Sequence, residues 1–241
     1  MLLFLMALAA LATSIISGII GMGGGVLLIS LMSLFLDYKL LIPIHGIVQF
    51  VSNSSRCFML RKHIRKDFFV PFLLGVPLGF MIAYFILKKI TQTHYLYLLL
   101  AILIFYTIFK PKKLPQIKLN SYGWTYLGIA SGILGPLIGP TGPLIAPFYV
   151  RDDIQKEEIV ATKASQQIIT HFLKIPLFLS LDFSYTKHLS LILFMSVAAI
   201  LGTRIGLILL KQVNTEIFKL IFKIMLFSAG VRILIKFWNL I

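Results

Sequence analysis

The chain has 241 residues, of which 59% are hydrophobic and 13% are charged, and its mean hydropathy is +0.95. A soluble domain carries about 25% charged residues, so this composition excludes a soluble fold and indicates an all-α polytopic membrane protein. The net charge of +15 does not predict nucleic-acid binding, because the Lys and Arg residues lie in short loops between apolar runs, as they do in cytoplasmic loops.

The apolar segments follow the same order in two successive halves of the chain. Each half begins with a segment broken by Gly and Pro, continues with a helix that carries a polar stripe, and ends with two plain apolar helices. These segments are predicted at 2–36, 41–60, 68–88 and 93–110, and again at 122–150, 159–179, 187–210 and 215–238. We therefore expect a first transmembrane repeat at 1–110, a cytoplasmic linker at 111–120 and a second transmembrane repeat at 121–241.

Short motifs support the duplication. Ser17-Gly18-Ile19-Ile20-Gly21 is echoed by Ser131-Gly132-Ile133-Leu134-Gly135, and Gly75-x-x-x-Gly79 by Gly202-x-x-x-Gly206. The spaced glycines are typical of close helix packing in membranes. Whether the repeats are inverted or parallel stays open, with about seven or eight passes, because the loop charges are nearly the same in both arrangements.

The glycine-rich breaks are the first candidate for a binding site. Irregular backbone inside a bilayer persists where it lines a polar cavity, and breaks at matching positions of two repeats are typical of a transporter's substrate site. The helices that restart after the breaks would present free N–H groups to an anion. The alternative is that the glycines only allow close packing. The candidate substrate-binding residues in the breaks are Gly23, Gly24, Gly25, Gly139, Thr141 and Gly142.

The polar stripe is the second candidate. Its first copy places His45, Gln49, Ser52, Asn53 and Arg56 on one helix face, and an offset of 118 residues gives Lys163, Gln167, Thr170, His171 and Lys174. All of these except Lys163 are predicted to bind substrate. The Ser, Asn and Gln residues could instead be interhelical hydrogen-bonding groups. His45 and His171 are candidates for a coupled proton, with a structural histidine as the alternative.

Two stripe residues are cations in an apolar surrounding. Arg56 and Lys174 need a partner there, yet all eight Asp and Glu residues fall at or near loops. The simplest partner is a mobile anion. The chain has no Walker-type loop, no metal-binding motif and no need of a cofactor, which predicts a secondary permease rather than an enzyme. The alternative function is a translocase or an intramembrane enzyme that acts on an anionic lipid headgroup.

The motifs Gly18-x-x-Gly21-x-Gly23-Gly24-Gly25, Asn53-x-x-Arg56 and His171-x-x-Lys174, in this order, resemble those of the sulfite exporter TauE/SafE family of membrane permeases. The second break departs from the pattern because it lacks three consecutive glycines. The resemblance implies transport of a small sulfur-containing or organic anion, such as sulfite or a sulfonate, across the cytoplasmic (inner) membrane of a prokaryote, often outward. It leaves open which anion is carried, the direction, the coupling ion and whether the chain forms a homo-oligomer.

Overall fold

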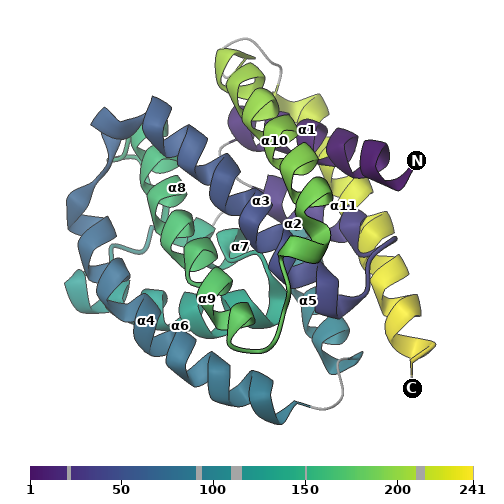
Figure 1. Cartoon of the computed structure of the whole chain (residues 1–241). Helices are drawn as coiled ribbons and strands as arrows, with labels where there is room; N and C mark the ends of the chain where they lie inside the picture. Colours follow the sequence, from purple (N-terminus) through teal and green to yellow (C-terminus); the bar gives the residue numbers. More distant parts are fainter. Residues whose placement is uncertain (21–22, 91–93, 110–115, 150, 210–214, 241) are drawn as a thin grey trace.

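The computed structural model in Figure 1 describes residues 1–20, 23–90, 94–109, 116–149, 151–209 and 215–240. In these ranges every regular element is a helix. The α-helices are α1 (Leu2–Ile20), α2 (Gly24–Met32), α3 (Tyr38–Met59), α4 (Lys66–Lys89), α5 (His94–Phe109), α6 (Ser121–Ile138), α7 (Gly142–Ile145), α8 (Lys156–Phe172), α9 (Lys174–Leu179), α10 (Leu189–Leu209) and α11 (Thr215–Trp238). Short 3-10 turns lie at Arg61–His63, Ala146–Tyr149 and Thr186–His188.

Three segments of the described chain are long and apolar enough to cross a bilayer: Leu2–Ile19, Lys66–Lys89 and Thr186–Leu209. His94–Phe109 is a shorter apolar helix. Large apolar side chains such as Leu74 and Leu78 of α4 point outward, where a soluble protein would carry charge. The all-α, multi-pass membrane protein expected from composition is confirmed.

Both predicted breaks are present. α1 ends at Ile20 and α2 begins at Gly24, beside α1, so that a Cβ atom on Gly24 would lie 2.5 Å from Cβ of Ser17. The first broken segment therefore doubles back. At the second break α6 ends at Ile138, and the backbone turns at Gly139 with a φ of +94°. This left-handed conformation is unfavourable for residues with a Cβ atom.

The polar-stripe helix of the second half differs from the prediction. A continuous helix over 159–179 was expected, but α8 ends at Phe172 and α9 starts at Lys174. Pro176 explains the break, because it has no N–H group to donate to the carbonyl of Phe172. The corresponding helix α3 also contains a proline, Pro43, but continues to Met59. That proline lies in the second turn of α3 and does not end the helix.

The spaced glycines hold two pairs of helices together. A Cβ atom on Gly79 of α4 would lie 2.8 Å from Cα of Gly132 in α6, and one on Gly206 of α10 would lie 2.9 Å from Cα of Gly18 in α1. These distances are too short for any side chain. The packing role predicted for both Gly-x-x-x-Gly motifs is confirmed.

The contacts also give the direction of each helix pair. In α4 and α6, Gly75 faces Thr125 and Gly79 faces Ile129, so these two helices run parallel. In α1 and α10, Gly202 faces Leu11 and Gly206 faces Ile15, which makes that pair parallel as well.

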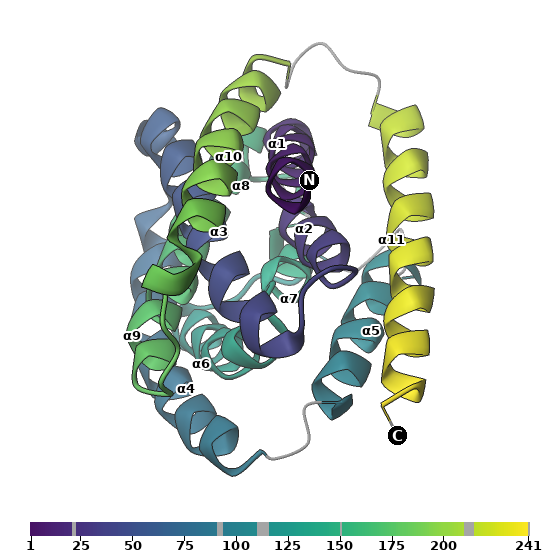
Figure 2. The same ribbon diagram turned by 45° about the vertical axis from the view of Figure 1, so that its right-hand side comes forward.

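Two further helix pairs, α3 with α8 and α5 with α11, run antiparallel. Gly46 of α3 faces Lys174, while Phe50, one turn further on, lies 5.7 Å from the ring of Phe172 in α8. Arg65, which follows α3, donates its N–H to Oγ1 of Thr162, near the start of α8. Figure 2 shows α5 and α11 side by side at one flank. There the rings of Phe105 and Phe227 are 5.9 Å apart and those of His94 and Phe237 are 6.1 Å apart.

We expect Gly79→Leu and Gly206→Leu each to destabilise the protein, because the new side chain would force apart two helices that touch through their backbones. Overpacking of this kind costs about 1–3 kcal/mol. Heating followed by size-exclusion chromatography in detergent measures the loss of monodisperse protein. Leu78→Phe, on the outward face of α4, is the matched control. Equal thermal stability of all three variants would contradict the packing role.

Candidate functional site

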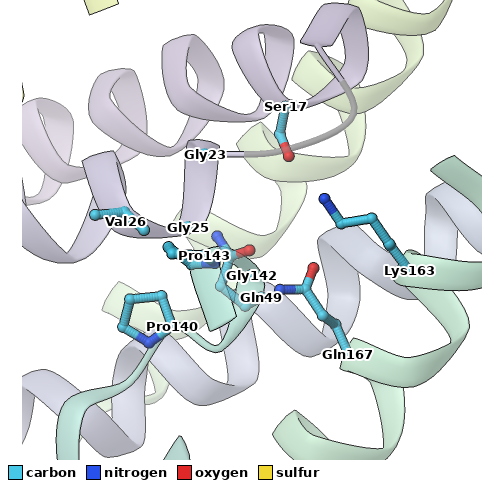
Figure 3. A pocket seen from close by; sticks show the side chains of 10 residues that line it. All are labelled: Ser17, Gly23, Gly25, Val26, Gln49, Pro140, Gly142, Pro143, Lys163 and Gln167. Atoms are coloured by element: carbon cyan, nitrogen blue, oxygen red, sulfur yellow. The ribbon is translucent and has the colours of Figure 1, made fainter. Parts of the chain in front are cut away.

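A polar pocket lies where the two breaks meet the stripe helices α3 and α8 (Figure 3). The space that admits a water-sized molecule is about 10 Å³, which is room for about one water. The pocket is therefore small. These are Ser17, Gly23, Gly25, Val26, Gln49, Pro140, Gly142, Pro143, Lys163 and Gln167.

Two glutamines at equivalent stripe positions face the two breaks. A Cβ atom on Gly25 would lie 3.2 Å from Oε1 of Gln49, and one on Gly142 would lie 3.1 Å from Nε2 of Gln167. Any side chain at either glycine would crowd the amide beside it. The glycines therefore bring backbone and amide groups together in a small polar space, where a solute could be hydrogen-bonded from several sides.

Lys163 is the charged residue of the pocket. It is 1% exposed and extends from α8 into the pocket together with Gln167 (Figure 3). Lys163 belongs to the stripe but was not predicted to bind substrate. Its equivalence to His45 at the offset of 118 residues was the signal that could have found it. Ser17, Val26, Pro140 and Pro143 also line the pocket without having been predicted.

Lys174 lies beside the second break rather than in the pocket. Its Nζ donates to the carbonyl oxygen of Gly139 at 2.5 Å and is 3.3 Å from Nδ1 of His171. The carbonyl stands at the C-terminal end of α6, where the helix dipole favours a cation. The sequence suggested a mobile anion as the simplest partner of Lys174. In the structure its partners are the carbonyl of Gly139 and the imidazole of His171.

His45 connects the two breaks. Its ring lies 5.6 Å from that of His171, and its Nε2 is 2.9 Å from the carbonyl oxygen of Gly25 in the first break. A Cβ atom on Gly139 in the second break would lie 3.5 Å from Nδ1 of His45. Among the described residues Nδ1 has no hydrogen-bond partner.

Arg56 is buried further along α3, with 2% of its surface exposed. Its Nη1 donates to Oδ1 of Asn53 at 3.2 Å, and Nδ2 of Asn53 donates to the carbonyl oxygen of Gln49. Within the described part of the chain, Nε and Nη2 of Arg56 have no hydrogen-bond partner. Arg56 is thus a buried cation that is connected to the pocket-lining Gln49 through Asn53.

The remaining predicted residues have local partners or pack elsewhere. The hydroxyls of Ser52 and Thr203 are 3.0 Å apart, which links α3 to α10, and Thr170 donates to the carbonyl of Gln167. The contact of Ser52 matches the interhelical alternative considered for the stripe, whereas that of Thr170 lies within α8. Gly24 packs against Ser17 of α1. Thr141 is buried at the start of α7, and among the described residues its hydroxyl has no partner.

Acidic groups are kept away from this region. Seven of the eight acidic side chains are described, and each is exposed or half-buried at a helix start or in a loop. In the loop before α8, the hydrogen bond from Arg151 lowers the pKa of Asp153 to about 2. Glu216 lies outside the described side chains. None of the described acidic groups forms an ion pair with Arg56 or Lys174.

A family model described as "Sulfite exporter TauE/SafE" matches residues 6–233. The chain belongs to the sulfite exporter TauE/SafE family. It is therefore a multi-pass membrane transporter, which confirms the resemblance seen in the motifs. Proteins of this family are transporters rather than enzymes, in keeping with the expected permease. No curated protein and no solved structure shows a significant match.

The backbone at the second break gives a stability prediction. Gly139→Ala places a Cβ atom on a left-handed residue, which costs about 1–2 kcal/mol, so we expect a lower thermal midpoint in detergent. Gly135→Ala, four residues earlier in α6, is the matched control, because its Cβ atom would meet only the Thr141 side chain at 3.3 Å and Lys174 at 3.7 Å. A Gly139→Ala midpoint equal to that of the control would contradict the strained turn.

Proposed function

We propose that this protein is a secondary transporter for a small sulfur-containing or organic anion, such as sulfite or a sulfonate, in the cytoplasmic membrane of a prokaryote. The observation that carries the proposal is the small polar pocket between two helix breaks, lined by Lys163, Gln49 and Gln167. Such a pocket between discontinuous helices is typical of a transporter's central site.

The charges around the pocket favour an anion. Lys163 lines the pocket and Arg56 and Lys174 are buried nearby, while every described acidic group is at a helix start or in a loop. A dehydrated anion in this space gains attraction from the cations, and a cation would be repelled. The amide groups of Gln49 and Gln167 and the backbone N–H groups can then replace water around oxyanion oxygens.

We further propose that the two halves are inverted repeats, with the bounds 1–110 and 121–241 joined by the linker 111–120. In an inverted repeat, equivalent helices lie antiparallel across the pseudo-twofold axis. The antiparallel pairs α3–α8 and α5–α11 join equivalent helices, while α1–α10 and α6–α4 are matching parallel pairs between the halves. Residues 110–115 of the linker lie outside the described residues.

The inverted repeat supports a mechanism of alternating access. The pocket is lined by residues of both breaks and is small in the present conformation. Opening toward one side requires one break to move away from the stripe helices. The glycine contacts between α1 and α10, and between α4 and α6, would let each pair move as a unit.

A translocase or an intramembrane enzyme for an anionic lipid headgroup is less well supported. In this structure the pocket admits little more than a water molecule, and the family consists of transporters. A lipid headgroup would also need a lateral opening that keeps its acyl chains in the bilayer. The proposed substrate is therefore a water-soluble anion rather than a lipid.

A flux screen in reconstituted vesicles tests the proposed function. The purified protein is inserted into vesicles, and movement of sulfite, sulfate, thiosulfate, methanesulfonate and acetate is measured against protein-free vesicles. We expect flux of at least one sulfur-containing or organic anion. No flux of any of them by folded, inserted protein, or movement of labelled anionic lipid instead, would contradict the proposal.

We expect Lys163→Met, Arg56→Ala and Lys174→Ala each to reduce this flux by at least about tenfold, since each removes a buried cation that stabilises the anion. Flux per inserted protein in the same vesicles is the measurement. Lys187→Met and Arg61→Ala, at exposed positions outside the pocket, are matched controls and should keep the flux. Unchanged flux in all three site variants would contradict a role of these cations in transport.

A further inference from the structure

We propose that the anion is transported together with a proton, and that Nδ1 of His45 carries this proton. The inference rests on the proposed anion transport and adds the identity of the coupling ion. It starts from a cluster of three buried basic side chains between the two breaks, in which His171 lies against both His45 and Lys174.

The hydrogen bonds of the cluster assign the protons. With Lys174 charged, its Nζ donates to the carbonyl of Gly139 and to Nδ1 of His171, which makes this Nδ1 an acceptor and leaves the His171 ring neutral. The carbonyl of Gly25 can only accept, so Nε2 of His45 carries a hydrogen and donates it. The lone pair on Nδ1 of His45 then stays available for a proton.

The surroundings of His45 limit the positive charge that it can accept. The basic groups facing it are His171 on α8 and Lys174 on α9, whereas α2 and the second break contribute the backbone of Gly25 and Gly139. No described acidic group lies in this cluster. A second positive charge beside Lys174 is therefore unfavourable while the pocket is empty.

An anion in the pocket removes this obstacle. Gly25 and Gln49 line the pocket, and His45 is hydrogen-bonded to Gly25 and lies one helical turn before Gln49. A negative charge in the pocket attracts a proton to the nearby His45. By linkage, a protonated His45 raises the affinity for the anion to the same degree. The two ions are thus favoured together and disfavoured singly, which is the requirement for co-transport.

The proton step is simple. An N–H bond forms at Nδ1 of His45 with a proton taken from hydronium on the side where the pocket opens, and the same bond breaks when the proton returns to water on the other side. His171 is less suited to this step. Protonation of its Nδ1 would remove the acceptor of Lys174 and place two cations 3.3 Å apart.

The test measures anion flux and proton movement in the same vesicles. Wild-type protein is reconstituted with a pH-sensitive dye inside, and gradients of sulfite, thiosulfate and methanesulfonate are imposed in turn. Protein-free vesicles correct for acid that crosses unaided. We expect the internal pH to change with anion flux, and an imposed pH gradient alone to drive accumulation of the anion against its own gradient.

The variant His45→Gln separates the proton from the anion. Its amide nitrogen can still donate to the carbonyl of Gly25, but the side chain cannot bind a proton. We expect the protons moved per anion to fall by at least about tenfold, with anion flux still detectable and insensitive to pH between about pH 6 and pH 8. His63→Gln, at an exposed position outside the cluster, is the matched control and should behave as the wild type.

Each outcome decides between the proposals. Proton movement at the wild-type ratio in His45→Gln overturns the role of His45, and anion flux without proton movement in the wild type overturns the coupling while leaving anion transport intact. Absence of all anion flux in the wild type overturns both. If His45→Gln does not fold, NMR of wild-type protein with labelled histidine rings replaces it. Sulfite at about pH 6 must then shift a buried ring to the imidazolium form, and no shift overturns the proposal.

Discussion

The constraint on which this structure depends is the burial of Arg56 and Lys174 in an apolar surrounding, where none of the described acidic groups pairs with them. A lone ammonium or guanidinium group in a membrane interior is costly, so other groups must solvate it. The second helix break supplies part of the answer, because the free carbonyl of Gly139 at the end of α6 accepts from Lys174. The second break thus also stabilises the buried charge of Lys174.

The same break requires support from the rest of the fold. A residue with positive φ and unsatisfied backbone groups persists only where neighbouring helices hold it. The glycine contacts provide this support, since α6 lies against α4 and α1 against α10 at backbone distance. The close crossings leave room for α3 and α8 in the centre, where Gln49 and Gln167 reach the breaks. Packing, backbone geometry and charge therefore depend on one another.

The sequence predicted the fold well where the signal was local. The breaks near Gly23 and Gly139, the stripe on α3 and the packing glycines all appear as expected, because each follows from residue size, backbone freedom or helical period. The end of α8 at Phe172 was not predicted, although the sequence contains Pro176 four residues later. A proline within an apolar run can kink a helix or be tolerated, and the packing around it decides which.

Composition and pattern alone determined that the chain is a helical membrane protein, that it breaks at two glycine-rich points and that polar residues line one face of two helices. Only the tertiary structure decided which stripe residues face the pocket. It brought Lys163 into the lining, gave Lys174 a carbonyl partner and turned Ser52 toward Thr203. The reason is physical: helical period gives the face of a helix, but the direction and rotation of its neighbours decide what that face meets.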